Sequence, residues 1–312
     1  MRAIGLMKTG GPEVLEILDL PEVNADDHEV RVKVHAAAIN PTDILARNGG
    51  HSARQKDFEP PYVPGMDIAG IVDQVGSKVD TGVKVGDSVM GMVVPKGSHG
   101  AYREQIVLNS RAITHIPNGR SFEESCTVPM NGLTALLSLE LLGLSSGQTI
   151  AVTGAAGLYG SYVIQVSKNM GLQVVADAAE KDIDLVKSFG ADHIVPRGDD
   201  VADNILNIFP DGVDGLADGA VLNEKVVKAV RSSGSFTSVR GYKGNGERGI
   251  NFSETWVFSW DCKFDKLNKL RKLVDNGILK LRVADIYEPE NISSAHARFE
   301  AGGTRGRLVI KF

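Results

Sequence analysis

The run TGAAGLYG, residues 153–160, lies between an apolar strand-like run, TIAVT, and a helix-like run that begins at Ser161. A strand, a glycine-rich turn and a helix in this order strongly restrict the fold. Strand-like and helix-like runs then alternate as far as about residue 240. Strands linked through helices form parallel sheets with right-handed crossovers. We therefore predict an α/β fold with a doubly wound parallel sheet in this part of the chain.

The helix-like runs between the strands have apolar residues on one face and end at glycines. One such run ends before Gly171 and the next before Gly190, a residue type that commonly terminates helices. A glycine at position 215 weakens the pattern of the fourth strand. The five predicted strands cover residues 149–153, 172–178, 192–195, 212–218 and 235–239.

The first third of the chain has a different pattern. In EVRVKVHA, residues 29–36, valines alternate with other residues, which is typical of a half-buried strand. Ser121 and Glu124 form a capping-box pattern before a helix-like segment. Beyond residue 265, residues 266–277 predict an amphipathic helix, and residues 307–312 predict a final strand.

Composition excludes several classes of protein. With 312 residues, a net charge of −5 and scattered basic residues, the chain gives no electrostatic reason to bind nucleic acid. No apolar run is long enough to cross a membrane, and Gly5 interrupts any signal-peptide core. The two cysteines, Cys126 and Cys262, form no disulfide framework. We expect a cytoplasmic protein of two domains.

The glycine run has two interpretations, a phosphate-binding loop or only a tight turn. Compared with G-x-G-x-x-G, the stretch AAGLYG matches only at Gly157 and Gly160. The preceding strand, the following helix and a second strand ending at Asp177 supply the context that this motif requires. In such a loop, backbone N–H groups and a helix N-terminus bind a diphosphate. The context favours a dinucleotide site.

Seven motifs extend this interpretation to almost the whole chain: INPTD, PPYVPGMDIAGIVDQVG, VGDSV, HGAYREQIVL, GLTALLSL, TGAAG and TRGRLVIKF. In their order and spacing they resemble the zinc-free quinone oxidoreductases of the medium-chain dehydrogenase/reductase superfamily, the group that includes zeta-crystallin. The resemblance implies a GroES-like, β-rich catalytic domain in residues 1–117 and a Rossmann domain in 118–264. Residues 265–312 would return to the catalytic domain, and the active cleft would lie between the domains.

Zinc-dependent members of this superfamily bind the metal through a cysteine and a His-Glu pair. Here the corresponding positions hold Asn40 or Pro41, and Met66 with Asp67. A catalytic zinc needs three protein ligands, so we predict no metal. Without a Lewis acid, acceptors that are already electrophilic, quinones and conjugated enones, are favoured. No ligand spacing relates the seven histidines, His28, His35, His51, His99, His115, His193 and His296.

The end of the second strand bears on the choice between NADPH and NADH. Asp177 is the acid that an NAD site would use, but the family register places Ala178 at the discriminating position. Lys181 and Arg197 are cations suited to a 2′-phosphate, although either one has an alternative interpretation as a solvated surface residue. We predict NADPH, with NADH as the alternative.

The resemblance implies a hydride site around Asn40, Asp43 and Arg47, and Tyr159 replaces a valine that backs the nicotinamide ring in relatives. Asn40 also fits a simple capping role in a turn before Pro41, and Asp43 also fits the start of a helix. Tyr159 would stack on the ring, narrow the cleft or turn into packing, and we expect it to shape the acceptor pocket. The cofactor-binding residues that we predict are Thr134, Gly154, Ala155, Ala156, Gly157, Leu158, Tyr159, Gly160, Ala178, Lys181, Arg197 and Arg240.

The chain is therefore expected to be an NADPH-dependent oxidoreductase that transfers a hydride to a quinone or an α,β-unsaturated carbonyl without zinc. One alternative is an NADPH-binding sensor or structural protein of the same fold, which the altered GLYG sequence allows. Another is a zinc-free alcohol dehydrogenase. Relatives commonly dimerise through the edge of the nucleotide domain, so we expect a homodimer with residues 253–260 as the edge strand.

Overall fold

The computed structural model describes residues 1–312, which form two compact units. One helix, α4 (Pro129–Leu142), begins in the first unit and continues into the second. The predicted domain limits at residues 117 and 264 stay predictions. The first unit contains Met1–Met130, Trp260–Asn276 and Leu281–Phe312, and the second contains Asn131–Ser259 and Gly277–Lys280.

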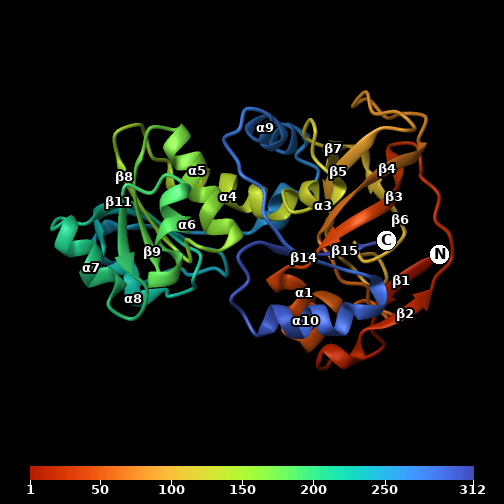
Figure 1. Ribbon diagram of the computed structural model, residues 1–312, viewed down its shortest axis with the longest axis horizontal. Helices are drawn as coiled ribbons and strands as arrows, with labels where there is room; N and C mark the ends of the chain where they lie inside the picture. Colours follow the sequence, from red (N-terminus) through yellow and green to blue (C-terminus); the bar gives the residue numbers. More distant parts are fainter. The chain divides into compact units, whose positions relative to one another are not determined.

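The second unit is built on a six-stranded sheet in which every neighbouring pair is parallel, as the sequence predicted. Its strand order is β10-β9-β8-β11-β12-β13. The strands are β8 (Thr149–Thr153), β9 (Gln173–Ala178), β10 (His193–Pro196), β11 (Val213–Asp218), β12 (Val230–Ser238) and β13 (Asn251–Glu254). The connecting helices are α5 (Leu158–Asn169), α6 (Ile183–Ser188), α7 (Val201–Ile208) and α8 (Glu224–Val227), shown in green and cyan in Figure 1.

The strand order reverses between β8 and β11. The chain builds outward from β8 through β9 to β10, and then crosses to β11 on the other side of β8. Doubly wound sheets bind ligands beyond the carboxyl ends of the strands at such a reversal. The glycine run follows β8 directly, so the predicted phosphate loop lies at this point.

The predicted edge strand over residues 253–260 is correct only at Ser253 and Glu254 and is wrong beyond them. The edge strand β13 ends at Glu254, and Val257–Trp260 form a 3-10 helix. Val257 and Trp260 are both buried, whereas Trp256 is 44% exposed. Apolar residues three positions apart lie on one face of such a helical turn, so the aromatic-rich run that indicated a strand instead closes the core by a turn.

The first unit contains a larger, mainly antiparallel sheet and a separate two-stranded ribbon of β1 (Arg2–Gly5) with β2 (Glu16–Asp19). The sheet order is β14-β15-β3-β4-β5-β7, and β6 also pairs with β3. Its strands are β3 (Glu29–Ala38), β4 (Asp67–Val75), β5 (Ser88–Met92), β6 (Gln105–Asn109), β7 (Ile113–His115), β14 (Val283–Tyr287) and β15 (Arg307–Lys311).

The end of the chain completes this unit. β15 pairs with β3 antiparallel and with β14 parallel. Figure 1 shows the blue C-terminal segments beside the red and orange N-terminal ones, with α10 next to α1. The helices of the unit are α1 (Pro41–Asn48), α2 (Ser52–Gln55), α3 (Phe122–Ser125), α9 (Phe264–Asp275) and α10 (Ile292–Glu300). The predicted capping box at Ser121 and Glu124 is confirmed.

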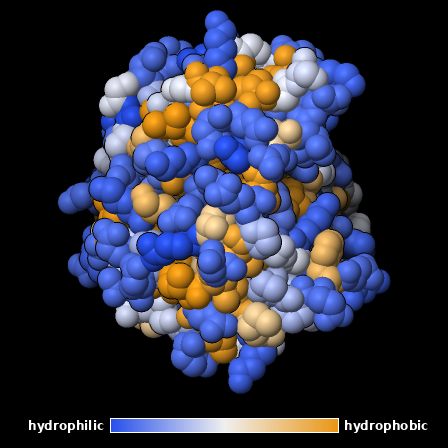
Figure 2. Space-filling view, turned by 90° about the vertical axis from the view of Figure 1, so that its right-hand side faces the viewer, coloured by the Kyte–Doolittle hydropathy of each residue, from blue (hydrophilic) through white to orange (hydrophobic).

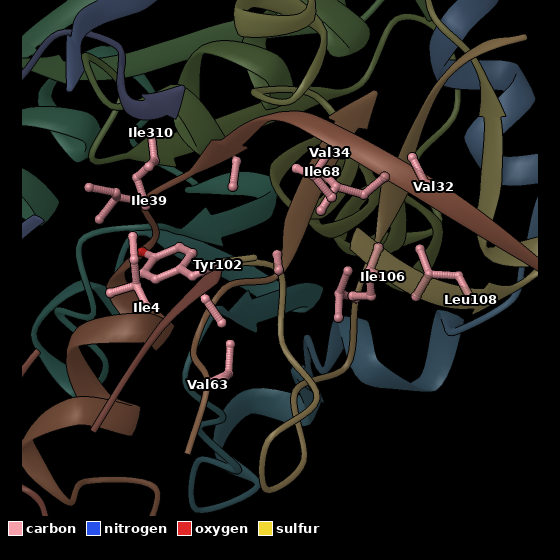
Figure 3. Close-up of a cluster of buried hydrophobic side chains, with 14 of the residues drawn as sticks. Ile4, Val32, Val34, Ile39, Val63, Ile68, Tyr102, Ile106, Leu108 and Ile310 are labelled. Atoms are coloured by element: carbon pink, nitrogen blue, oxygen red, sulfur yellow. The ribbon is translucent and has the colours of Figure 1, made fainter. Parts of the chain in front are cut away.

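The core of the first unit is aliphatic and includes one tyrosine. Alternate residues of β3, Val30, Val32 and Val34, are buried, which confirms the predicted strand pattern. Figure 3 shows the Tyr102 ring among aliphatic side chains that include Ile4, Ile39 and Val63. The Tyr102 hydroxyl is a polar group within this apolar cluster, so it needs a hydrogen-bond partner.

The face of the molecule shown in Figure 2 has no single large apolar region. On the face shown in Figure 2, apolar residues form several patches separated by hydrophilic ones. Scattered apolar residues of this kind are normal on protein surfaces. No helix has both the length and the apolar character required to cross a membrane.

Candidate functional site

Asn40 lies at the N-cap of α1, directly before Pro41. Its backbone N–H donates to Oδ2 of Asp43 at 2.8 Å, and its Nδ2 donates to Oδ2 of Asp67 at 2.7 Å. The predicted capping role is therefore present, because Asp43 satisfies the backbone at the start of the helix. The contact with Asp67 adds something further, since it fixes which end of the Asn40 carboxamide faces β4.

Asp43 is 1% exposed and accepts three hydrogen bonds. Besides Asn40, the donors are the backbone N–H of Gly65 at 3.2 Å and the Tyr102 hydroxyl at 2.9 Å. Burial raises the Asp43 pKa to about 6, while these donors act to lower it. Above that pH the carboxylate is ionised, and it holds the N-terminus of α1 against the loop that contains Gly65.

Asp67 is the second buried carboxylate of this group. Its Oδ1 accepts from the backbone N–H of Met130, in the first turn of α4, at 2.6 Å. Burial raises the Asp67 pKa to about 7, whereas the donors Met130 and Asn40 and the buried Arg307 act to lower it. From the sequence, Asp67 is only part of a replaced metal site, and its role as the partner of Asn40 was missed. An acid within the apolar run GMDIAGIV was the available signal.

Arg47 and His296 complete the group. Nη2 of Arg47 donates to Oε1 of Glu300 at 2.6 Å, and Arg47 is 1% exposed. Nε2 of His296 lies 3.2 Å from the Tyr102 hydroxyl, which already donates to Asp43, so this histidine nitrogen is the donor. Burial, and then Arg47, lowers the His296 pKa to about 3, which keeps the ring neutral.

No role for His296 was predicted from the sequence. His296 and Glu300 are four residues apart on α10, as Asp43 and Arg47 are on α1. Residues at this spacing share a helix face. Nothing in the sequence indicated that these two helices pack together, so the two pairs could not be linked before the structure.

The positions that hold zinc ligands in metal-dependent relatives have other partners here. Asn40 binds Asp67, and the Met66 sulfur accepts from Oγ1 of Thr42 at 3.1 Å. Within residues 1–312, no group of three or more His, Cys, Asp or Glu side chains is arranged to hold a metal ion. An amide and a thioether are also poor zinc ligands compared with thiolate and imidazole.

In the second unit, the glycine loop joins β8 to α5. Gly154 has a φ of +67°, which favours glycine. A Cβ on Gly160 would lie 2.5 Å from the Gly154 carbonyl oxygen, so α5 reaches the loop this closely only without a side chain there. Gly157 is the N-cap of α5, and the first turn carries no acidic residue. The positive end of this helix dipole therefore suits a diphosphate.

Asp177, at the end of β9, faces this loop. Its Oδ1 accepts from the backbone N–H of Ala155 at 3.0 Å. Burial raises the Asp177 pKa, and the Ala155 bond and nearby Arg197 oppose that rise. The carboxylate that an NAD site would direct at a ribose thus fixes the loop instead. This contact favours the interpretation in which Ala178, the next residue, marks the ribose position.

The cations predicted for a 2′-phosphate are at the surface. Lys181 lies in a short 3-10 helix (Glu180–Asp182) after β9, and Arg197 follows β10. The Arg197 backbone N–H donates to the carbonyl oxygen of Ala178 at 3.0 Å. This bond places Arg197 beside the end of β9. Arg240 lies beyond the end of β12 and is also exposed.

Tyr159 lies in the first turn of α5. Its hydroxyl is 2.8 Å from Oγ of Ser138 on α4, and its ring contacts Gly219, where an added Cβ would be 2.7 Å from Cδ1 of the tyrosine. Leu158 is buried, so its side chain adds bulk to the core. Thr134 lies on α4 and is 8% exposed. The ring of Tyr159 thus lies between the ends of β8 and β11, while its hydroxyl points inward.

Two known families match separate parts of the chain. The family described as alcohol dehydrogenase GroES-like domain matches residues 26–136. The family described as zinc-binding dehydrogenase matches residues 189–310.

The chain is also similar to characterised reductases along almost its whole length. It is 32% identical to 2-methylene-furan-3-one reductase of Solanum lycopersicum, covering 99% of this chain and 79% of that protein. It is 30% identical to the chloroplastic NADPH-dependent alkenal/one oxidoreductase of Arabidopsis thaliana, covering 96% and 77% of the two.

A solved structure extends the comparison. The quinone oxidoreductase of Coxiella burnetii is 26% identical, with a TM-score of 0.86, covering 100% of this chain and 99% of that one. The GroES-like and Rossmann architecture expected from the motifs is therefore confirmed. The chain belongs to the quinone oxidoreductase family of the medium-chain dehydrogenase/reductase superfamily.

Proposed function

We propose that the protein is an NADPH-dependent oxidoreductase that reduces a quinone or an α,β-unsaturated carbonyl without zinc. The observation that carries the proposal is the glycine loop at the β8/β11 reversal, with a helix N-terminus free of acidic side chains. Two relatives, named as a 2-methylene-furan-3-one reductase and an NADPH-dependent alkenal/one oxidoreductase, support this class of acceptor. Bound NADPH would supply a hydride from C4 of its nicotinamide ring.

In this proposal the residues of the chain bind and orient the cofactor. In the proposed site the backbone around Ala156 and Gly157 and the start of α5 hold the diphosphate. Lys181 and Arg197 would bind the 2′-phosphate, because Asp177 is already engaged with Ala155. Positioning of this kind accounts for much of what a protein adds to nicotinamide chemistry.

Asn40 is fully buried, so we propose that it positions the start of α1 at the hydride site and does not itself contact the acceptor. Asp67 fixes its carboxamide, and Asp43 fixes its backbone. We assign Asp43 and Arg47 to positioning, because both are buried and bound within the first unit. The balancing proton then comes from solvent.

The central test is stopped-flow mixing of the NADPH-loaded protein with a small quinone and, separately, with an enone. An enzyme oxidises the bound NADPH at a rate that rises with acceptor concentration. A protein that binds NADPH but leaves it reduced with both acceptors is instead the sensor or structural protein, which the altered GLYG sequence allows. Activity that survives dialysis against a chelator would support zinc independence.

Cofactor choice has its own test. Lys181→Ala and Arg197→Ala should each raise the Kd for NADPH while leaving that for NADH unchanged, since only NADPH has a 2′-phosphate. The matched control is Lys187→Ala, an exposed lysine at the end of α6. Equal losses for both cofactors would contradict the assignment.

We also propose a cytoplasmic homodimer that associates through the β13 edge. The edge strand lies next to Trp256, a partly exposed aromatic residue of the kind enriched at interfaces. Sedimentation of the wild type and of Trp256→Glu tests this, because a charge in such an interface should release monomers. A wild type that sediments as a monomer would refute the proposed dimer.

A further inference from the structure

A row of hydroxyl groups starts at Tyr159 and runs through the second unit. The Tyr159 hydroxyl is 2.8 Å from Oγ of Ser138, which is 3.0 Å from Oγ1 of Thr255. Thr255 Oγ1 is 2.6 Å from Thr237 Oγ1, and Thr237 donates to the carbonyl oxygen of Ser253 at 2.9 Å. We call these four hydroxyls the hydroxyl chain. It joins α5 and α4 to β12 and to the residue after β13.

The end of the hydroxyl chain determines the direction of every bond in it. A carbonyl oxygen accepts only, so the Thr237 hydrogen must point to Ser253. Each hydroxyl has one hydrogen. Thr255 therefore donates to Thr237, Ser138 donates to Thr255, and Tyr159 donates to Ser138.

This direction excludes the hydroxyl chain as a path that delivers protons to Tyr159. The chain ends at a carbonyl, which has no proton to return, and Ser138, Thr255 and Thr237 are all at most 2% exposed. Burial also raises the Tyr159 pKa well above the usual value for a tyrosine. The hydroxyl chain therefore holds Tyr159 in place and does not supply it with protons.

The ring that is held in this way lies at the strand reversal. Tyr159 follows the glycine loop after β8, and its ring contacts Gly219, directly after β11. The side chain is only partly buried, although its hydroxyl is turned inward. A dinucleotide at the reversal would pass beside this ring.

We infer that Ser138, Thr255 and Thr237 are positioning residues that act through Tyr159, holding its ring as a fixed wall beside the nicotinamide. The inference rests on the proposed function, because it assigns a purpose to Tyr159 within that site. A positioning role of this kind differs from simple packing in one respect. The position of the Tyr159 ring depends on hydroxyl groups up to three hydrogen bonds away, none of which touches a ligand.

The test uses variants that remove one hydroxyl with little change in shape: Tyr159→Phe, Ser138→Ala, Thr255→Val and Thr237→Val. Thr255→Ser, which keeps the hydroxyl, is the matched control. We expect kcat for a quinone to fall about three- to tenfold for Tyr159→Phe and Ser138→Ala, the range of one net hydrogen bond. NADPH affinity should change less, because the diphosphate contacts remain. Thr255→Ser should behave as the wild type.

Non-additivity separates an anchor from independent packing effects. The double variant Tyr159→Phe with Ser138→Ala should lose no more kcat than either single variant, since both remove the same bond. The solvent isotope effect of enone reduction should persist in Tyr159→Phe, because the proton does not come from this hydroxyl. Additive losses, or a Thr255→Ser as slow as Thr255→Val, would overturn the inference.

A second measurement does not depend on turnover. The fluorescence lifetime of bound NADPH should shift together in the four hydroxyl-removing variants and stay at the wild-type value in Thr255→Ser. If the wild type binds NADPH but leaves it reduced with every acceptor tested, the proposed function fails. The lifetime series would then still test whether the Tyr159 ring is held beside the nicotinamide. Identical lifetimes in all variants would contradict the inference.

Discussion

Arg47 and Glu300 lie 253 positions apart in the sequence, and they join α1 to α10 through a 2.6 Å hydrogen bond. One helical turn away, Asp43 and His296 are joined through the Tyr102 hydroxyl. Both pairs have the four-residue spacing of one helix face. The start of α1, where Asn40 lies, is therefore fixed from the C-terminal part of the chain.

Loss of the Glu300 carboxylate should destabilise the protein. Arg47 is buried, and Glu300→Ala would leave its Nη2 without an acceptor, at a cost of about 1 to 3 kcal/mol. Urea unfolding measures this as a lower midpoint. Glu300→Gln keeps an acceptor oxygen and should lose less. Equal stability of the alanine variant and the wild type would show that the pair contributes nothing.

Protonation of His296 should oppose folding in acid. Its pKa is lowered to about 3 in the folded protein, against about 6.5 in an unfolded chain. Between these values only the unfolded chain binds the proton, so stability is full above pH 6.5 and falls as the pH decreases towards 3. The stability advantage of the wild type over His296→Gln should shrink over this range. His28→Gln, at an exposed site, should show no such trend in urea titrations from pH 7.5 to 4.

Asp67 should show the opposite trend. Its pKa is raised from 3.8 to about 7, so between these values the folded protein binds a proton that the unfolded chain does not. The contribution of Asp67 to stability is therefore lost as the pH rises from about 4 to 7. Unfolding free energies of wild type minus Asp67→Asn should fall over that range and level off above it. The exposed Asp57→Asn serves as the control, and a flat difference for Asp67→Asn would refute the assignment.

The glycine loop offers a steric test with a matched pair. A Cβ at Gly160 would lie 2.5 Å from a backbone oxygen and 2.7 Å from Cα of Ala155. At Gly157 the nearest atom is 3.1 Å away. Gly160→Ala should therefore displace α5 and weaken NADPH binding at least about tenfold, with Gly157→Ala closer to the wild type. Calorimetric titration with NADPH decides, and equal affinities would contradict the proposed close approach.

The sequence predicted β8, β9 and β10 of the second unit well, because these strands are short, largely apolar and lie near glycines. TIAVT coincides with β8, and the predicted strand at residues 192–195 differs from β10 by one residue at each end. The run at residues 253–260 misled because aromatic and β-branched residues favour strands locally. Tertiary packing of Val257 and Trp260 overrode that preference.

The site was predictable only where consecutive residues or short motifs indicate it. The glycine loop could be read from consecutive residues, and the family motifs indicated Asn40, Asp43 and Arg47. His296, Tyr102 and the hydroxyl chain could not be read, because their partners lie far apart in sequence and no periodicity links them. Contacts of this kind depend on how elements pack, which a single sequence does not show.

The pairing of β15 with β3 has a consequence for how the protein is made. During translation, residues 29–38 leave the ribosome well before their neighbour at residues 307–311. The strands of the parallel sheet, residues 149–254, are all synthesised between the two. The nascent chain must therefore keep an unfinished antiparallel sheet protected from aggregation until β15 has emerged.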